Sequence, residues 1–142
     1  MKKVICFGTF DLLHLGHLNY FQQAKKQGDY LIVVIATDKT KQTQRKQTIF
    51  TEQERCTLVQ SLQIVDEAVI GNTDDHFRII VEKTPDIICL GYDHQVTEEK
   101  ITQELAKHNL FPKIVRAVAY KPERYKSSEI KNVIKKKTNV PS

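Results

Sequence analysis

The sequence predicts an α/β fold in which a single domain surrounds a doubly wound, five-stranded parallel sheet. Short runs of β-branched and aromatic residues alternate along the chain with segments of helical periodicity. Residues 30–36, YLIVVIA, are apolar without interruption, as in a strand that helices cover on both faces. The length of 142 residues suits one domain with one core, which we expect at 1–137, followed by a short tail at 138–142.

The first half of the chain is expected to hold two strands and two helices. Residues 3–7 form the first strand, and apolar residues at helical spacing predict a helix over 16–27 that stops before Gly28. The second strand covers 30–36. Thr51 and Glu54 form a capping box that opens a helix reaching about residue 62.

The second half is expected to hold three strands and three helices. The apolar runs predict strands at 67–70, 86–90 and 113–118. Helices are expected at 74–83, 97–108 and 128–136. The first of these is set at Asp74 and Asp75, because acidic residues favour a helix N-terminus, and Pro85 follows its end.

Residues 8–17, GTFDLLHLGH, place two histidines around a glycine where the first strand turns into a helix. Free backbone N–H groups and the positive end of the helix dipole favour bound anions there, phosphate oxygens in particular. Gly16 lets a ligand approach the backbone, and the imidazoles of His14 and His17 project to one side, where both can donate to phosphate oxygens. A lone histidine is more often a surface or core residue, but this combination is not demanded by folding alone.

Other classes of protein fit the sequence less well. Zinc binding lacks further ligands at metal-site spacing, and Cys6, Cys56 and Cys89 are too widely spaced to suggest a disulfide. No apolar stretch nears the length of a membrane span and nothing reads as a signal peptide, so we expect a cytoplasmic protein without a membrane partner. The net charge of +5 suits phosphorylated ligands, whereas the dispersed lysines and the lack of a recognition module argue against nucleic acid.

Several polar segments follow predicted strands and are expected to converge at the carboxyl edge of the sheet, where ligands of such folds bind. They contain His14, Asp38, Asp93 and residues 126–128. The polar connection over 37–50 is expected to be a loop. For any one of its basic residues a solvated position is the simplest interpretation, although basic side chains beside such an edge also suit a triphosphate.

The segment GTFDLLHLGH resembles the signature of the His-x-Gly-His nucleotidyltransferases. This superfamily includes glycerol-3-phosphate and phosphocholine cytidylyltransferases, pantetheine-phosphate adenylyltransferase and archaeal FAD synthetase. The resemblance extends over nearly the whole chain, through Thr37-Asp38, residues 52–55, residues 65–66, residues 90–93 and residues 126–128. It implies a Rossmann-like fold and a homodimer.

The resemblance implies direct nucleotidyl transfer. A phosphomonoester attacks the α-phosphorus of a nucleoside triphosphate in line and pyrophosphate leaves, without a covalent enzyme intermediate. His17 is expected to act on the α-phosphate and His14 on the β- and γ-phosphates, with Lys46 completing the catalytic set. The expected nucleotide-binding residues are Gly8, Thr9, Phe10, His14, Gly16, His17, Gly91, Tyr92, Asp93, Arg124, Lys126, Ser127 and Ser128. The expected acceptor-binding residues are Asp11, Asp38, Lys46 and Arg55.

Mg²⁺ or another divalent cation is expected to bridge phosphate oxygens, with Asp11 as the nearest carboxylate. An equally good interpretation makes Asp11 a cap for the turn that follows the first strand. Ser127 and Ser128 likewise have an ordinary explanation as N-caps of the last helix.

Three functions are possible for this chain, of which two are enzymes with different substrates. Residues 91–94, GYDH, resemble the Gly-Tyr-Asp-Gln of archaeal FAD synthetase with histidine in place of glutamine, and together with residues 65–71 and the Ser127-Ser128 pair they favour ATP and FMN. The alternative is CTP with glycerol 3-phosphate. A catalytically silent nucleotide-binding regulatory domain is the third, against which the intact His14 and His17 argue.

Overall fold

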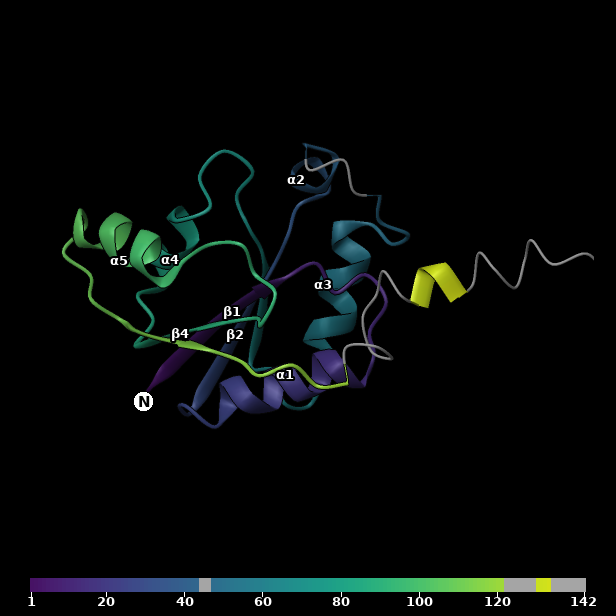
Figure 1. Ribbon diagram of the computed structural model, residues 1–142, viewed down its shortest axis with the longest axis horizontal. Coiled ribbons are helices and arrows are strands. Elements are labelled where there is room, and N and C mark those ends of the chain that lie inside the picture. The colour runs from purple at the N-terminus through teal and green to yellow at the C-terminus, as the bar shows by residue number, and fades with distance from the viewer. Residues whose placement is uncertain (44–46, 122–129, 134–142) are drawn as a thin grey trace, which may run out of the picture.

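The computed structural model of the chain describes residues 1–43, 47–121 and 130–133 (Figure 1). Five strands form a single parallel sheet in the order β3-β2-β1-β4-β5. The strands are β1 (Lys3–Gly8), β2 (Tyr30–Ile35), β3 (Glu67–Ile70), β4 (Ile87–Leu90) and β5 (Lys113–Arg116). The predicted fold class is therefore confirmed, with each strand within a residue or two of its expected limits.

The helices between the strands cover both faces of the sheet (Figure 1). They are α1 (Leu15–Lys25), α2 (Asp38–Thr43), α3 (Glu52–Gln60), α4 (Arg78–Lys83) and α5 (Glu98–Ala106). Side chains of α1 and α3 pack on one face and those of α4 and α5 on the other. This two-sided cover explains why β2 is apolar along its whole length.

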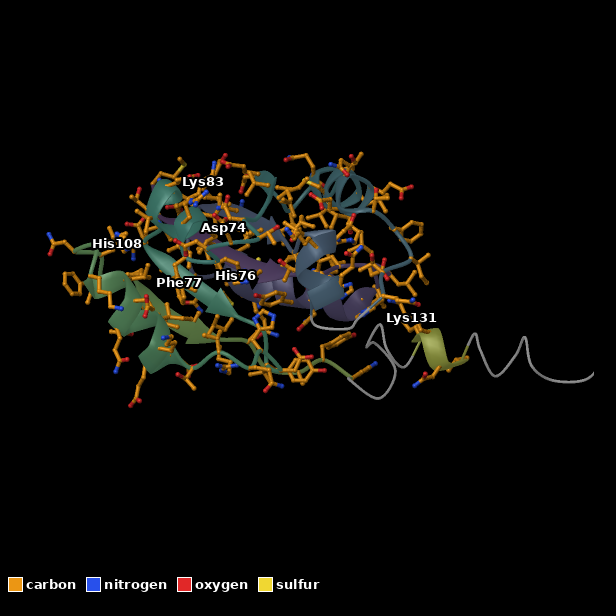
Figure 2. All side chains as sticks on the ribbon, turned by 90° about the horizontal axis from the view of Figure 1, so that it is seen from above. Asp74, His76, Phe77, Lys83, His108 and Lys131 are labelled. Atoms are coloured by element: carbon orange, nitrogen blue, oxygen red, sulfur yellow. The ribbon has the colours of Figure 1, made fainter. Side chains whose placement is uncertain are left out.

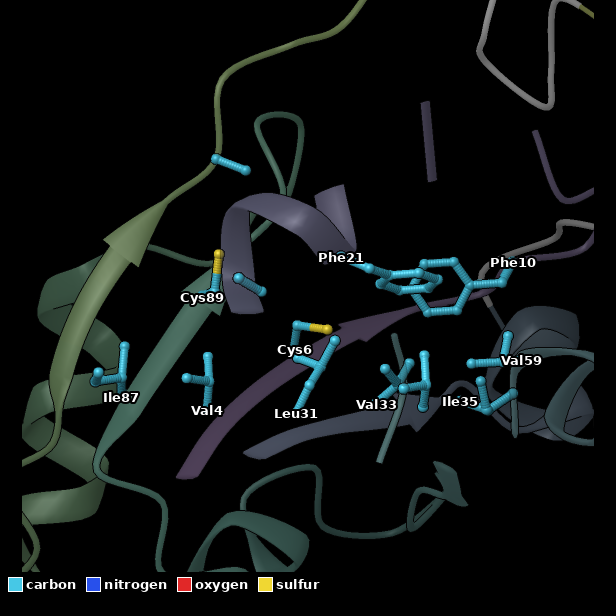
Figure 3. Close-up of a cluster of buried hydrophobic side chains, with 13 residues drawn as sticks. Val4, Cys6, Phe10, Phe21, Leu31, Val33, Ile35, Val59, Ile87 and Cys89 are labelled. Carbon is cyan, nitrogen blue, oxygen red and sulfur yellow. The ribbon is translucent and has the colours of Figure 1, made fainter. Parts of the chain in front are cut away.

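On the α1 side, two phenylalanines close the core near the carboxyl end of β1, at the right in Figure 3. Phe10, just beyond β1, packs its ring 4.9 Å from that of Phe21 on α1. Val33 and Cys89 lie in the same cluster, on the two strands that flank β1. On the other face, Ile5 and its neighbours form a second cluster with α4 and α5.

Two expectations about the helices were wrong. The connection expected to be a loop contains α2, whose first turn is held by the Thr37 hydroxyl accepting from the N–H of Thr40 (3.0 Å). Helix α4 begins at Arg78 instead of Asp74. Asp75 uses its carboxylate to accept from the N–H of Phe77 in a preceding turn, so the acidic pair stands outside the helix.

Other limits agree closely with the sequence. The Thr51–Glu54 capping box is present, and α5 is capped by the hydroxyl of Thr97. Helix α1 ends at Lys25, two residues short of the expected limit. Of the last predicted helix only residues 130–133 are described, and they are helical. The proposed boundary at 137/138 and the tail lie outside the described residues, and no described helix has the length and apolarity to span a membrane.

We predict that Gly8→Ala destabilises the fold by about 1–3 kcal/mol, the usual cost of overpacking. A Cβ at Gly8 would lie 2.4 Å from Cζ of Phe10, whose ring is 3% exposed and has no room to move. Urea unfolding measures the change in free energy. Gly71→Ala is the matched control, because its Cβ would lie 3.1 Å from a methyl group of Val34, and it should cost less. Equal costs would contradict the prediction.

Candidate active site

The candidate site lies at the carboxyl ends of β1 and β4, where the strand order reverses direction. Strand β1 pairs with β2 on one side and with β4 on the other. The chain leaves β1 into the GTFDLLHLGH segment and leaves β4 into residues 91–97. Tyr20 on α1 joins the two strand ends, because its hydroxyl donates to the carbonyl of Cys89 (2.7 Å) and accepts from the N–H of Phe7 (3.3 Å).

His14 and His17 form a stacked pair at the start of α1. Their ring centroids are 3.8 Å apart with an interplanar angle of 24°. His14 is the N-cap of the helix, since its Nδ1 accepts from the N–H of Gly16 (3.0 Å). Nδ1 is therefore unprotonated and Nε2 carries the proton of the neutral ring, so His14 presents a hydrogen-bond donor.

Burial keeps both imidazoles neutral at physiological pH. It lowers the pKa of His14 below the usual value, and it lowers the pKa of His17 to about 3, with a smaller contribution from repulsion by His14. Nδ1 of His17 is buried and has no hydrogen-bond partner among the described residues. An unsatisfied buried nitrogen is costly, which makes this atom a candidate contact for a ligand.

Phe10 shapes the segment between β1 and the histidines. Its backbone is left-handed (φ 54°), an uncommon conformation for a bulky residue, and its ring lies edge-on to His17 at 5.2 Å. Because the ring is in the core, any contact of Phe10 with a nucleotide is left to its backbone. Gly8 is required by this ring, since a Cβ there would collide with it.

Arg55 and Asp38, both expected to bind the acceptor, form an ion pair with each other, and their contact with the acceptor stays a prediction. Arg55 is fully buried and donates from Nη2 to Oδ1 of Asp38 (2.7 Å), from Nη1 to the carbonyl of Thr9 (2.9 Å) and from Nε to the carbonyl of Phe50 (3.1 Å). Asp38 and Glu52 also exchange backbone-to-carboxylate hydrogen bonds. In this arrangement Arg55 lies in the interior and positions the backbone of Thr9 through its carbonyl.

Asp11 is almost fully buried and binds three donors. Its carboxylate accepts from the N–H groups of Ile49 (2.8 Å) and Phe50 (2.9 Å) and from Nζ of Lys131. Burial alone would raise the pKa of Asp11, but the hydrogen bonds from Lys131 and the two N–H groups outweigh it and hold the pKa below its usual value. Lys131 lies at the end of the molecule away from α4, and sequence reasoning did not single it out (Figure 2).

These contacts bear on the expected metal. Mg²⁺ is held by oxygen ligands, and both oxygens of Asp11 are already engaged. Among the described residues no group of three or more His, Cys, Asp or Glu side chains is placed to hold an ion. The geometry thus favours Asp11 as a cap for the loop at 49–50, and its role as a metal ligand stays a prediction.

The loop after β4 is held in place by Arg116, at the end of β5. The guanidinium donates from Nη1 to the carbonyls of Gly91 and His94 (both 3.0 Å) and from Nη2 to that of Val96 (2.9 Å), and it pairs with Glu98. Such a clamp on backbone carbonyls leaves no signature in the sequence except an arginine at a strand end. Tyr92 and Asp93, in the same loop, are exposed.

The structure therefore brings together part of the expected set. Gly8, Thr9, His14, Gly16 and His17 meet at the end of β1, with residues 91–93 across the switch point at the end of β4. The remaining expected residues, Lys46, Arg124, Lys126, Ser127 and Ser128, lie outside the described residues.

Comparison with known proteins assigns the family. Residues 5–133 match the family model described as cytidylyltransferase-like. The chain belongs to the cytidylyltransferase-like family. The resemblance and the nucleotidyltransferase fold expected from the sequence are confirmed by this match.

Two curated relatives of this cytidylyltransferase-like chain are named FAD synthase. The protein from Picrophilus torridus is 44% identical over 132 residues, covering 93% of this chain and 95% of its own length. That from Thermoplasma volcanium is 39% identical over 134 residues, covering 94% of each.

Solved structures share the fold. A crystal structure titled as the lipopolysaccharide core biosynthesis protein of Thermoplasma volcanium superposes with a TM-score of 0.83 at 41% identity, covering 84% of this chain and 98% of that one. A pantoate-beta-alanine ligase from Francisella tularensis has the same fold at 17% identity, with a TM-score of 0.59 over 94% of this chain and 69% of its own.

We predict that Arg55→Met destabilises the protein by about 3 kcal/mol, because it leaves the Asp38 carboxylate and two carbonyls without their buried donor. The change is measured by urea unfolding. Arg78→Met is the control, since it removes an exposed ion pair with Asp74 and should have a much smaller effect. Similar effects of the two substitutions would show that the buried network contributes little.

We predict that the free energy of unfolding decreases as the pH is lowered, and that part of this decrease is due to His17. The pKa of His17 is about 3 in the folded protein against 6.5 ordinarily, so the unfolded chain takes up a proton first. The stability associated with the neutral His17 is fully present above pH 6.5 and is lost progressively as the pH falls toward 3. Urea unfolding over this range should give a shallower pH dependence for His17→Asn than for the unsubstituted chain. Equal slopes would mean that His17 titrates normally.

Proposed function

We propose that this cytidylyltransferase-like protein transfers the adenylyl group of ATP to FMN, forming FAD and pyrophosphate. The observation that carries the proposal is the stacked, neutral His14–His17 pair at the N-terminus of α1. The FAD synthase names of relatives that are 39–44% identical over nearly the full chain support the choice of substrates.

The geometry suits a reaction that proceeds by positioning and charge stabilisation. The FMN phosphate is already anionic near neutral pH, so it can attack the α-phosphorus without a strong general base. The bond from the FMN oxygen to phosphorus forms as the bond to the pyrophosphate oxygen breaks. Both leaving and entering groups are phosphates, and no covalent enzyme intermediate is needed.

The histidines would act as donors to the phosphate oxygens as charge moves onto pyrophosphate. Nε2 of His14 carries the proton of the neutral ring, because Nδ1 already accepts from Gly16. His17 would contact the α-phosphate and its transition state. The Gly8–Thr9 backbone, fixed from behind by Arg55, would hold the α-phosphate in place.

The other expectations enter the proposal as follows. Lys46, Lys126 and Ser128 would bind pyrophosphate or the acceptor, and Arg124 and Ser127 would contribute to binding of the nucleotide. A divalent cation would arrive with the triphosphate and neutralise part of its charge. The homodimer expected from the family resemblance also stays a prediction.

We predict that the purified full chain with Mg²⁺ releases pyrophosphate and forms FAD only when ATP and FMN are supplied together. The assay crosses ATP and CTP with FMN, glycerol 3-phosphate, phosphocholine and 4′-phosphopantetheine, with chromatography of the product. Activity only with CTP and glycerol 3-phosphate would make the protein a glycerol-3-phosphate cytidylyltransferase. Thermal stabilisation by ATP without turnover of any pair would favour a binding domain.

His17→Asn is the control for catalysis in this assay. If His17 acts mainly in the transition state, the substitution lowers kcat by about 100-fold or more with a small effect on KM for ATP. Unchanged turnover in this variant would remove His17 from the mechanism.

A further inference from the structure

His94 stands in the loop that follows β4, across the switch point from the histidine pair. Its imidazole lies against Gly91, where a Cβ would come within 2.9 Å of Nε2 and 3.1 Å of Cδ2. The N–H of Gly91 donates to Nδ1 of His94 (3.1 Å). The backbone donor at the end of β4 is therefore used within the loop and is not available to a ligand.

This hydrogen bond fixes the tautomer of His94. Nδ1 accepts a proton from a backbone N–H, so in the neutral ring the proton is on Nε2. Among the hydrogen bonds of the described residues none uses Nε2 of His94, and the side chain is partly exposed. The unused hydrogen-bond donor of this loop is therefore the Nε2–H of His94 and not the N–H of Gly91.

The imidazole of His94 contacts Gly91 of its own loop and a ring of α1. Tyr20 of α1 lies edge-on to it at 6.1 Å, and Tyr20 itself stacks with Phe10 at 6.3 Å. Since Phe10 also contacts His17, a continuous row of rings runs from the histidine pair to His94. Arg116 fixes the loop backbone by donating hydrogen bonds to the carbonyls of Gly91 and His94.

The surroundings favour the neutral ring. Burial has the largest effect and lowers the pKa of His94. The charge of Asp93 opposes it, and the charges of Arg116 and Lys41 each lower the pKa by less. A protonated ring would also place a hydrogen on Nδ1, facing the N–H of Gly91. The donor geometry therefore persists at physiological pH.

We propose that His94 is a nucleotide-binding residue whose Nε2–H donates to a ring nitrogen of the adenine base. The inference rests on the proposed binding of ATP at this site. A fixed donor pairs with an acceptor, and adenine offers N1, N3 and N7, whereas its exocyclic amine is a donor and would be repelled. A rigid donor held by Gly91 and Tyr20 loses little entropy on pairing.

The test measures the Kd of ATP and of its 1-deaza, 3-deaza and 7-deaza analogues by calorimetry, each of which replaces one ring nitrogen with C–H. In the unsubstituted chain one analogue should bind about tenfold more weakly than ATP, the usual cost of one hydrogen bond. His94→Phe should weaken ATP binding by a similar factor and bind that analogue as well as it binds ATP. His94→Gln should retain the discrimination, because its amide can accept from Gly91 and still donate.

His108→Phe is the matched control, because His108 is an exposed histidine that follows the end of α5 (Figure 2). It should bind ATP and every analogue as the unsubstituted chain does. Equal discrimination by the unsubstituted chain and His94→Phe would overturn the proposal. Since the readout is binding, failure to form FAD and failure of this inference are separate outcomes.

Discussion

The buried guanidinium of Arg55 holds together three segments that the sheet alone would leave apart. The loop after β1, the start of α2 and the loop before α3 each contribute one acceptor, at Thr9, Asp38 and Phe50. Asp11 joins the last of these loops to the helical residues 130–133 through Lys131. The position of the segment that leads to the histidines depends on these buried polar contacts, because a parallel sheet fixes strand ends but not the loops beyond them.

The proposed phosphate site at the histidine pair would bind anions without a permanent positive charge. His14 and His17 are stacked and partly desolvated, so two cations in this position would repel each other and lose hydration. In the proposed site the ring nitrogens would act through hydrogen bonds, and the dipole of α1 would add to the attraction for anions. Such a site avoids the cost of burying charge when no ligand is bound.

The sequence was sufficient for the strands because each is a short apolar run that both layers of helices cover. It failed for α2, a polar segment of six residues whose first turn depends on Thr37 and whose Asp38 is held by Arg55. The start of α4 was set too early, because an acidic pair favours a helix N-terminus equally well from within the helix or from the turn before it. In both segments the backbone can form either a helix or a turn, and the outcome depends on contacts that hydrophobic periodicity does not reveal.

For the site, the motif around His14 and His17 was readable because its residue types are demanded by chemistry and not by packing. The burial of Arg55 could not be predicted, because a charged residue in a sequence carries no sign of its burial. Tyr20 and Arg116 were missed because both bind backbone carbonyls far away in the chain, which no side-chain pattern records.

The clamp formed by Arg116 also has a consequence for the order in which the protein matures during synthesis. The loop after β4 is complete in covalent terms before β5 is made, yet its carbonyls at Gly91, His94 and Val96 have no guanidinium to bind until Arg116 has left the ribosome. Strand β5 lies at the edge of the sheet, beside β4, and is the last strand to be synthesised. Ligand recognition at this loop is therefore acquired late, and a nascent chain that stops short of β5 carries the histidine motif without an ordered partner across the switch point.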